Sequence, residues 1–523
     1  MTGLVLTSRR GAWVSDALFL AGIVLAVLTE AIASTTLSLS RGDVIGDTYA
    51  TLDEFAWLDI SYTTLKLVGF VTAPWLMTRL NPHSILIASV AGMGLASGVA
   101  TITASLQLLI ALRVAQGLAG GCLLVAGQAI IFLNYPLDRQ PFLQALFATG
   151  AVVAPATIAP ALEGWLLDSQ SWAWIFFSVV PIALLSAGCL ALASAPTALV
   201  LPSRPFDWIG FLLISVSLFC FTYVFSQGSR WDWFEEPRIL WLVIFGTANL
   251  LAFLARQLMA KGRGLLDLSA FQSNDFVFSF IVSFVAGAAL FGSGFLIPLF
   301  AVSLLAFTPT AAGLLLLPSG ALFIVALLVA ARLIQVRHVP PFAMAPIGIL
   351  SIMYAMWMLS GSTTESGAQD MAGPVLVRGL GLGFLFLSIT LVAFGKLTPA
   401  NLSSGIGLFN TGRQLGGLMG VAGLQSLIDH HIAGNLSVLG ASLTTGTPAV
   451  SERLARTSAM FAARGMDAAE ANRAATSLLV RTVTGQSTVI AFDTAFNAVA
   501  LLFVFAAPVM VAIKIVLGRT RKA

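Results

Sequence analysis

Long apolar runs separated by short polar breaks make up most of this chain. A helix that crosses a bilayer needs about 20 predominantly apolar residues, and fourteen runs of roughly that length follow one another along the sequence. They cover approximately residues 17–40, 55–78, 84–104, 106–133, 142–167, 172–194, 208–228, 238–259, 277–302, 311–335, 340–361, 373–395, 404–428 and 490–516. The pattern therefore predicts an all-α integral membrane protein with about 14 transmembrane helices.

The composition agrees with a lipid environment. Of the 523 residues, 58% are hydrophobic and 10% are charged, and the mean hydropathy is +0.93. Soluble domains contain roughly 25% charged residues, so a water-soluble core of this size would leave too much apolar surface exposed. The three cysteines all lie in apolar runs. They indicate small packed side chains and no disulfide framework.

The distribution of positive charge predicts how the chain is oriented. Alternating spans place both termini on one side, and the loops on that side contain 15 of the 27 lysines and arginines. Positive residues concentrate in cytoplasmic loops, so both termini are expected in the cytoplasm. The one sizeable extramembrane segment, residues 429–489, would lie on the opposite face, with one or two short surface helices over 460–477.

A lone charge in the fourth apolar run points to function. Arg113 is the only charged residue between Leu80 and Leu137. An arginine at the centre of a transmembrane helix costs about 2.5–3.5 kcal/mol on insertion scales, so some gain must offset it. A similar sequence surrounds Arg378 in the twelfth run. Each of the two runs is followed by a short loop that contains proline.

This recurrence predicts an internal repeat. If spans 1–6 and 9–14 form two six-helix halves, the fourth member of each half contains the arginine. The predicted division is an N-terminal bundle over 1–200, two inserted helices over 201–265, and a C-terminal bundle over 266–523. Repeated halves around a midplane cavity are typical of transporters that alternate access by rocking one half against the other.

Several segments match motifs of a known family. They are 112–117 (Leu-Arg-Val-Ala-Gln-Gly), 154–165 (Ala-Pro-Ala-Thr-Ile-Ala-Pro-Ala-Leu-Glu-Gly-Trp), 172–177 (Trp-Ala-Trp-Ile-Phe-Phe) with Pro181, Trp57 and Tyr62, 227–228 (Gln-Gly) with 231–234 (Trp-Asp-Trp-Phe), and 409–417 (Phe-Asn-Thr-Gly-Arg-Gln-Leu-Gly-Gly). On these segments, and along nearly its whole length, the chain resembles the fourteen-span drug:proton antiporters of the major facilitator superfamily, the EmrB/QacA type.

The resemblance implies a major facilitator fold and a proton-coupled secondary exporter of amphipathic, drug-like or toxic compounds in the cytoplasmic (inner) membrane of a bacterium. The proton gradient would supply the energy, with no cofactor and no enzymatic activity. A periplasmic adaptor protein and an outer-membrane channel are implied partners in bacteria with two membranes, and residues 429–489 are a candidate contact for them. The alternative is a dedicated exporter, or a proton symporter, for a single metabolite.

Three departures from the family pattern bear on mechanism. Residues 28–32 read Leu-Thr-Glu-Ala-Ile where the family usually has Leu-Asp-Thr-Thr-Ile, so the acid has moved by one position. The fifth span has Ala159 and Glu163 where glycines are usual. The loop 74–81 lacks the usual glycines and aspartate. The usual proton-coupling acid therefore does not carry over directly, and a narrow substrate range stays open.

Glu30 is the candidate proton carrier. It is the only charge between Asp16 and Arg41 and lies near the middle of the first span. Burial in a low-dielectric medium favours the protonated form of a carboxyl group, so such a residue can take a proton from one side and release it to the other. The alternative is a glutamate satisfied by local hydroxyls or facing a wet cavity.

Asp59 and Lys66 are seven residues apart in the second span, about two helical turns, with Tyr62 between them. This spacing is too long for a direct pair within one helix. Lys66 is the deeper of the two and needs a partner from another helix, for which Glu30 is the candidate. Alternatively, Asp59 lies at the outer interface and the Lys66 side chain extends to the membrane surface.

The arginines have different expected roles. Arg113 would favour the ionised form of a nearby acid and so help to release the proton, although it also lies close enough to its span end to extend outward. Arg378 and Arg413 are expected to brace the second half or its inner gate instead of handling protons.

The fifth span is expected to bend. Pro155 and Pro160 each remove a backbone donor, and Gly164 belongs to the same antiporter-like motif. Glu163 lies near the outer end of this span, where an exposed role is slightly favoured over contact with a substrate cation. Glu163, Tyr62 and Trp57 are the candidate substrate contacts.

The sequence contains no motif that is typical of another functional class. The sequence has no Cys/His cluster with metal-ligand spacing, no glycine-rich phosphate loop with lysine, and no hydrolase or zinc-protease motif. No metal site, no ATP-driven transport and no nucleic-acid partner is predicted.

Overall fold

The computed structural model describes residues 2–193, 205–260, 264–441, 443 and 447–520. Helices account for the regular structure in these ranges, and no strand occurs in them. The helices of the first part are α1 (Thr2–Thr35), α2 (Arg41–Thr48), α3 (Leu52–Leu76), α4 (Pro82–Thr101), α5 (Leu106–Asn134), α6 (Gln140–Ala148), the π-helix η1 (Thr149–Ile158), α7 (Ala159–Ser169) and α8 (Ala173–Leu192).

The later helices follow the same up-and-down pattern. They are α9 (Trp208–Gln227), α10 (Pro237–Met259), α11 (Asn274–Ser303), α12 (Pro309–Arg337), α13 (Ala345–Leu359), α14 (Ala368–Phe394), α15 (Pro399–Ala441), α16 (Pro448–Ala462) and α17 (Ala468–Thr520). Short 3-10 turns are η2 (Ser229–Trp231), η3 (Trp233–Glu235), η4 (Leu268–Gln272) and η5 (Pro341–Met344).

The predicted spans all fall on helices. Within the described residues, twelve helical segments have the length and hydropathy of membrane spans. The other two predicted spans lie on α3 and α15, which contain more polar residues but pack inside the same bundle, α3 against α5 and α15 against α11. The chain is an all-α multi-pass membrane protein, as the apolar runs predicted.

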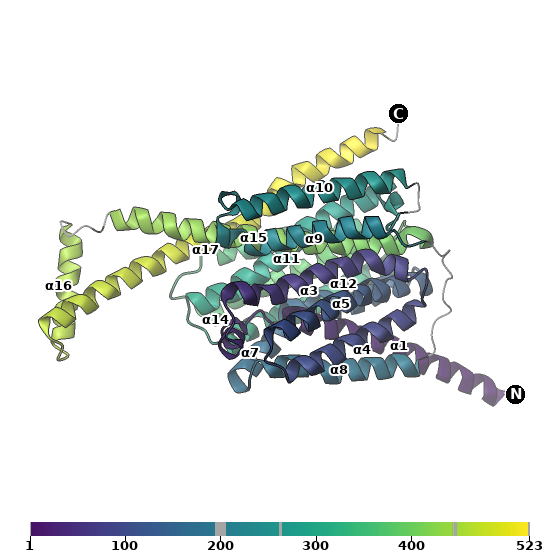
Figure 1. Cartoon of the computed structure of the whole chain (residues 1–523), viewed down its shortest axis with the longest axis horizontal. Coiled ribbons are helices and arrows are strands. Elements are labelled where there is room, and N and C mark those ends of the chain that lie inside the picture. Colours follow the sequence, from purple (N-terminus) through teal and green to yellow (C-terminus); the bar gives the residue numbers. More distant parts are fainter. Residues whose placement is uncertain (1, 194–204, 261–263, 442, 444–446, 521–523) are drawn as a thin grey trace.

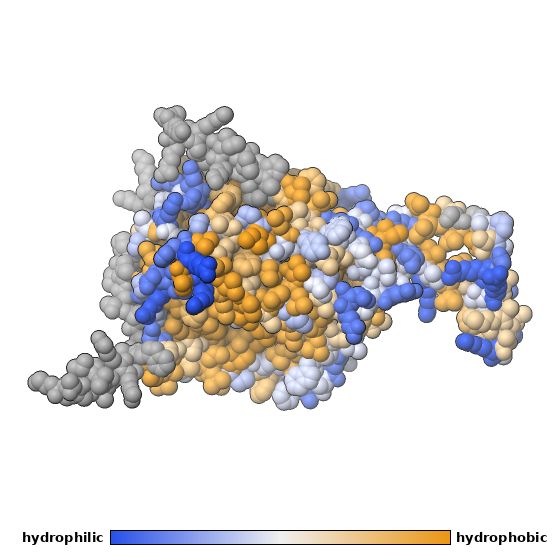
Figure 2. All heavy atoms as spheres, turned by 180° about the vertical axis from the view of Figure 1, so that it is seen from behind, coloured by the Kyte–Doolittle hydropathy of each residue, from blue (hydrophilic) through white to orange (hydrophobic). Residues whose placement is uncertain are grey.

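The helices run side by side along the long axis of the molecule (Figure 1). Both chain ends lie at one end of the bundle, called here the terminus end, and the connection between α15 and α17 projects from the opposite end, called here the arm end. Figure 2 shows apolar residues over the middle of the bundle and hydrophilic residues toward both ends and along the arm. Such a surface suits a bilayer around the middle of the bundle.

Helix packing shows which segments meet across the molecule. We call α1–α8 the first half and α11–α17 the second half. α12 packs along α6, η1 and α7, and α15 packs against α3 and α5, so the halves touch along two lines. α10 packs against α9, and α9 in turn packs against α3 and α15.

An ion pair joins the two helices between the halves. Asp207 precedes α9, and its Oδ1 lies 2.9 Å from Nε and 2.7 Å from Nη2 of Arg256 at the end of α10. The Arg256 guanidinium holds the pKa of the Asp207 carboxyl below its usual value. Asp207 also accepts a hydrogen bond from the Gly210 backbone and so caps the first turn of α9.

The fifth span, in which the two prolines predicted a bend, is not one continuous α-helix. It consists of α6, the π-helix η1 and α7. Pro155 lies inside η1 and Pro160 in the first turn of α7. A proline leaves a carbonyl without its usual donor, and local widening of the helix accommodates this change. The span therefore departs from α-geometry next to the partner helix α12.

The arm differs from its prediction. One or two short surface helices were expected over 460–477, but α16 ends at Ala462, and residues from Ala468 belong to α17, a single 53-residue helix that continues into the last span. No proline occurs between Ala468 and Ala507, and alanines favour the helix throughout this stretch. Val450 of α16 is buried in the arm with Ala471 and Ala475 of α17.

Candidate functional site

Glu30 and Lys66 form a buried ion pair between α1 and α3. Lys66 Nζ lies 2.5 Å from Glu30 Oε1, and Glu30 is only 1% exposed. The Tyr62 hydroxyl donates a hydrogen bond of 3.0 Å to the same carboxylate oxygen. Gly120 of α5 makes room for the group, since a Cβ there would lie 3.0 Å from Glu30 Cγ. Lys66 therefore contacts Glu30, the partner that its depth in the span predicted.

Arg113 and Asp59 form a second pair about two helical turns closer to the arm end. Arg113 Nη2 lies 3.5 Å from Asp59 Oδ1. Arg113 is 1% exposed and also donates to the backbone oxygens of Ala33, at 2.6 Å, and Leu58, at 3.4 Å. The alternative in which the arginine extends outward to the membrane surface is therefore wrong, because α1 and α3 enclose its guanidinium.

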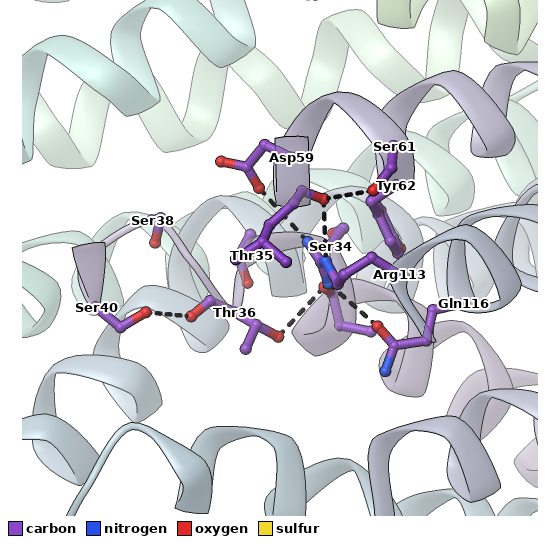
Figure 3. A network of polar contacts seen from close by, with 12 residues as sticks. Ser34, Thr35, Thr36, Ser38, Ser40, Asp59, Ser61, Tyr62, Arg113 and Gln116 are labelled. Atoms are coloured by element: carbon purple, nitrogen blue, oxygen red, sulfur yellow. Dashed lines mark hydrogen bonds and ion pairs between the residues drawn. The ribbon is translucent and has the colours of Figure 1, made fainter. Parts of the chain in front are cut away.

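Tyr62 connects these two pairs. The Arg113 guanidinium carbon lies 4.1 Å from the centre of the Tyr62 ring, in the range of a cation–π contact, while the Tyr62 hydroxyl reaches Glu30. Figure 3 shows Asp59, Tyr62 and Arg113 converging from α3 and α5 on the end of α1. We call Glu30, Asp59, Tyr62, Lys66 and Arg113 the charged cluster. The structure brings together all four residues proposed for proton coupling.

Two amide side chains extend this network in different directions. Gln116 accepts a hydrogen bond of 3.3 Å from Arg113 Nη1 and donates one of 2.9 Å to the Ser97 hydroxyl of α4. These two bonds connect the guanidinium to α4. Gln128 lies further along α5, outside the charged cluster, and reaches Gln144 at 3.3 Å. Neither amide was singled out from the sequence, although an amide in an apolar helix is itself a signal of an internal polar contact.

Glu163 is buried, which corrects the expectation of an exposed role. It has no exposed surface, and its Oε2 accepts a hydrogen bond of 2.7 Å from the Ser38 hydroxyl. Its Oε1 has no hydrogen-bond partner among the described residues. The position near the end of the span suggested solvent, but α7 is covered there by the chain that follows α1. Ser38 was not anticipated as its partner.

Trp57 and Tyr62 point in different directions. Trp57 is 38% exposed and stacks on Phe219 of α9 with ring centres 6.1 Å apart, close to Tyr223. Tyr62 is buried in the charged cluster. The structure therefore does not bring together the three proposed substrate contacts Trp57, Tyr62 and Glu163, and their role in substrate binding stays a prediction.

Small residues and one carboxylate join α7 to α12 near the arm end. Gly164 lies against the backbone of Pro309, and a Cβ at position 164 would come within 2.4 Å of the Pro309 oxygen. The Thr310 hydroxyl donates to Asp168 and also lies 3.1 Å from the Gly164 oxygen. The antiporter-like motif thus provides a close contact between the halves, where close approach requires glycine.

This contact gives a direct test. We expect Gly164→Ala to slow transport strongly, because the added methyl group forces α7 away from α12. Gly188→Ala is the matched control, since nothing lies within 4 Å of a Cβ at that position on α8. Initial transport rates in vesicles, normalised to folded protein, measure the effect. Equal rates for the two variants would show that this close contact is dispensable.

Arg378 is fully buried and has no acidic partner among the described residues. Its Nε donates a hydrogen bond of 2.7 Å to the Ser293 hydroxyl, and its Nη2 donates one of 3.3 Å to the Leu290 oxygen, both on α11. Its Nη1 has no hydrogen-bond partner in the described chain. The contacts join α14 to α11, which is compatible with the predicted bracing of the second half.

Arg413 belongs to a hydrogen-bonded chain that crosses between the halves. Its Nη2 donates a hydrogen bond of 2.6 Å to Asn410 Oδ1, and Asn410 Nδ2 donates one of 3.2 Å to Gln128 Oε1 on α5. Arg413 also lies 5.9 Å from the centre of the Phe386 ring. Its role as a brace near an inner gate stays a prediction, and Asn410 is a partner that sequence reasoning missed.

Asp493 of α17 is a further carboxylate that sequence reasoning missed. Its Oδ1 is buried and has no hydrogen-bond partner among the described residues. The signal in the sequence is that Asp493 is the only acid after Glu470. Within the described residues, no group of three or more histidines, cysteines and acids has the arrangement of a metal site.

The bundle, the interrupted fifth span and the buried arginines agree with one known family. The model of the Major Facilitator Superfamily matches residues 17–421. The chain belongs to the major facilitator superfamily. The matched region contains all of the charged cluster and both Arg378 and Arg413.

Characterised relatives are moderately similar to this member of the superfamily. The multidrug export protein EmrB of Haemophilus influenzae is 27% identical over 406 residues, 76% of this chain and 78% of its own length. The fatty acid resistance protein FarB of Neisseria gonorrhoeae is 25% identical over 504 residues, 95% of both chains. The colistin resistance protein EmrB of Acinetobacter baumannii is 22% identical over 497 residues, 94% of both chains.

Proposed function

We propose that this major facilitator protein is a proton-coupled secondary exporter of amphipathic, drug-like or toxic compounds. The observation on which the proposal rests most is the buried Glu30–Lys66–Tyr62 group between α1 and α3. The relatives are named for multidrug export and for resistance to colistin or fatty acids, and these names support export as the direction of transport. The proposal assigns the chain no enzymatic activity and no cofactor.

Glu30 has the properties of the coupling acid. When ionised, its carboxylate attracts the Lys66 ammonium at 2.5 Å. When it takes a proton, that attraction is lost, and the tie between α1 and α3 is weakened. Proton binding thereby changes the relative stability of arrangements of the first half, which is what coupling to alternating access requires.

Arg113 is proposed to assist proton release. Its guanidinium contacts the ring of Tyr62, whose hydroxyl binds Glu30, so the fixed charge acts on the acid through one intervening side chain. A positive charge nearby favours the ionised carboxylate. The Asp59 carboxylate offsets part of the positive charge of the same guanidinium, on the side nearer the arm end.

The charge distribution and the arm support a proposal for orientation and partners. We propose that the terminus end faces the cytoplasm, since the loops at that end contain most of the lysines and arginines. The arm formed by the end of α15, by α16 and by the start of α17 would then project outward. A periplasmic adaptor protein, connected to an outer-membrane channel, is the partner proposed for the arm.

An efflux panel tests the proposal. The protein is produced in a bacterial strain that lacks its other efflux pumps, and accumulation of amphipathic compounds is measured with and without a protonophore. We expect reduced accumulation that the protonophore reverses, because collapse of the proton gradient removes the driving force. Export that continues unchanged in the presence of the protonophore would contradict proton coupling, and accumulation equal to that of the empty strain would contradict export.

A further inference from the structure

Glu163 is a buried acid that the proposed coupling by Glu30 does not use. It lies on α7 near the arm end and has no exposed surface. The Ser38 hydroxyl donates a hydrogen bond of 2.7 Å to Oε2, whereas Oε1 has no hydrogen-bond partner among the described residues. None of the ion pairs in the described chain includes Glu163. The carboxyl group is therefore enclosed without a paired cation.

The elements around Glu163 contribute few charges near it. α7 packs against α12, η1, α8 and α1. η1, α8 and the covering chain 36–40 contain no charged residue. The charges of α12, which are Arg332 and Arg337, lie at its terminus end. On α1, Glu30 is the one charge in the later part of the helix, and it is already in an ion pair.

Arg113 and Asp59 of the charged cluster are the charged groups that act on Glu163 from α5 and α3. They form a pair with each other at 3.5 Å, so their effects on the Glu163 carboxyl group oppose each other. An ionised Glu163 would be a buried charge with one hydroxyl donor, whereas a protonated Glu163 leaves no charge at this position. Burying a charge without a paired cation costs far more than burying a neutral polar group. The arrangement therefore favours Glu163 with a proton bound.

Glu163 lies beside a contact that joins the two halves at the arm end. The next residue, Gly164, packs against the backbone of Pro309 on α12. Further along α7, Asp168 accepts a hydrogen bond from the Thr310 hydroxyl. A movement of α7 that brought water to Glu163 would therefore also disturb these contacts with α12. The position of Glu163 thus links its protonation to the closure of the arm end.

We propose that Glu163 is a second proton-binding site, and that the arm end closes when this site is occupied. When the arm end opens, water reaches Glu163 and the carboxyl group ionises, and closure requires it to take up a proton. Because the closed arrangement binds the proton more tightly than the open one, a lower pH favours closure. Glu30 differs, since its ion pair with Lys66 stabilises the ionised form in the buried state. The inference deepens the proposed function, on which it rests for the opening and closing of the arm end.

Infrared difference spectroscopy tests whether the proton is present. Purified full-length protein in lipid nanodiscs is measured at neutral pH, without substrate or gradient, and the spectrum of Glu163→Gln is subtracted from that of the wild type. We expect the carbonyl band of a protonated carboxyl group, which an exposed glutamate does not show because it is ionised at this pH. Ser38→Ala should shift this band, because the carboxyl group loses its hydrogen bond. The matched control Glu365→Gln, at an exposed acid in the loop before α14, should leave the band unchanged.

A distance measurement tests whether this proton controls closure. Spin labels are attached through Gln170→Cys and Ser303→Cys, at exposed positions beside the ends of α7 and α11, in protein whose three native cysteines are replaced by alanine. We expect the wild type to gain a longer-distance population as the pH is raised. The ratio of the two populations should change by at most about tenfold per pH unit, the limit for one proton. Glu163→Gln, which is permanently neutral, should keep the short distance over the same pH range, whereas Glu365→Gln should behave as the wild type.

The contradicting outcomes are equally defined. A wild-type spectrum without the band, a distance that does not depend on pH, or pH-dependent opening that persists in a folded Glu163→Gln variant would overturn the proposal. Thermal unfolding verifies each fold, and if Glu163→Gln does not fold, a shifted band in Ser38→Ala still supports the site and an unshifted band counts against it. Because no substrate or gradient is used, failure of proton coupling in the efflux panel would leave these results standing. Conversely, absence of a proton at Glu163 would leave coupling by Glu30 intact.

Discussion

Glu30→Gln is expected to abolish proton-driven export. The amide keeps the size of the side chain and can still accept hydrogen bonds from Lys66 and Tyr62, which contact Glu30 at 2.5 and 3.0 Å. It cannot take up or release a proton in the physiological range. The charged cluster would then keep one charge state, and proton movement could no longer drive the movement of the two halves.

The measurement is transport in inside-out vesicles with an imposed pH gradient. Substrate uptake per folded protein molecule should respond to the gradient in the wild type and should fall to the level of empty vesicles in Glu30→Gln. Exchange of substrate for substrate without a gradient should persist, because it needs alternating access but no net proton movement. This second readout separates a loss of coupling from a loss of substrate binding.

Glu365→Gln is a suitable control, since Glu365 is an exposed acid in the loop before α14. It removes the same charge by the same chemistry and should leave gradient-driven uptake unchanged. Uptake by Glu30→Gln that still follows the pH gradient would show that another group is the proton carrier. Glu163, which is buried, and Asp493, which is half-buried, would then be the next groups to test.

The sequence predicted the helices better than it predicted their contacts. Apolar runs define spans because each helix must satisfy its own backbone in lipid, and each of the expected spans lies on a helix of the structure. The Glu30–Lys66 pair was anticipated because a buried lysine requires an opposite charge. The Arg113–Asp59 pair was not, since it depends on how α3 and α5 are rotated and staggered against each other.

The errors have a common physical origin. Glu163 was expected near solvent because it lies close to a span end, but burial there is decided by the chain that follows α1, whose Ser38 covers it. In the arm, hydropathy marked only where the membrane span begins, whereas α17 begins at Ala468, because the alanine-rich stretch before the span also favours a helix and contains no proline. Both features depend on context that a single local pattern does not contain.

Removal of Lys66 is expected to have the largest effect on stability. Lys66→Met leaves the Glu30 carboxylate buried with only the Tyr62 hydroxyl as a close polar partner. Removing one member of a buried ion pair typically costs about 3–5 kcal/mol, because the remaining charge is left unpaired. Thermal unfolding of the purified variant in nanodiscs should therefore begin at a clearly lower temperature than in the wild type.

The double variant Glu30→Gln with Lys66→Met should recover most of that stability. No unpaired charge remains in it, and an uncharged pair of similar volume is often as stable as the ion pair that it replaces. The coupling energy between the two sites should therefore be about 0.5–3 kcal/mol, the range seen for residues in direct contact. Additive losses in the two single variants and the double would contradict a direct interaction.

Transport should behave differently from stability in the same set of variants. If Glu30 carries the proton, the double variant remains uncoupled even though its fold is restored, because it has no group that titrates at this position. If the pair serves only to hold α1 against α3, restoring stability should also restore gradient-driven uptake. The comparison of unfolding temperature with uptake in one double variant thus separates a proton carrier from a structural ion pair, which neither single substitution can do.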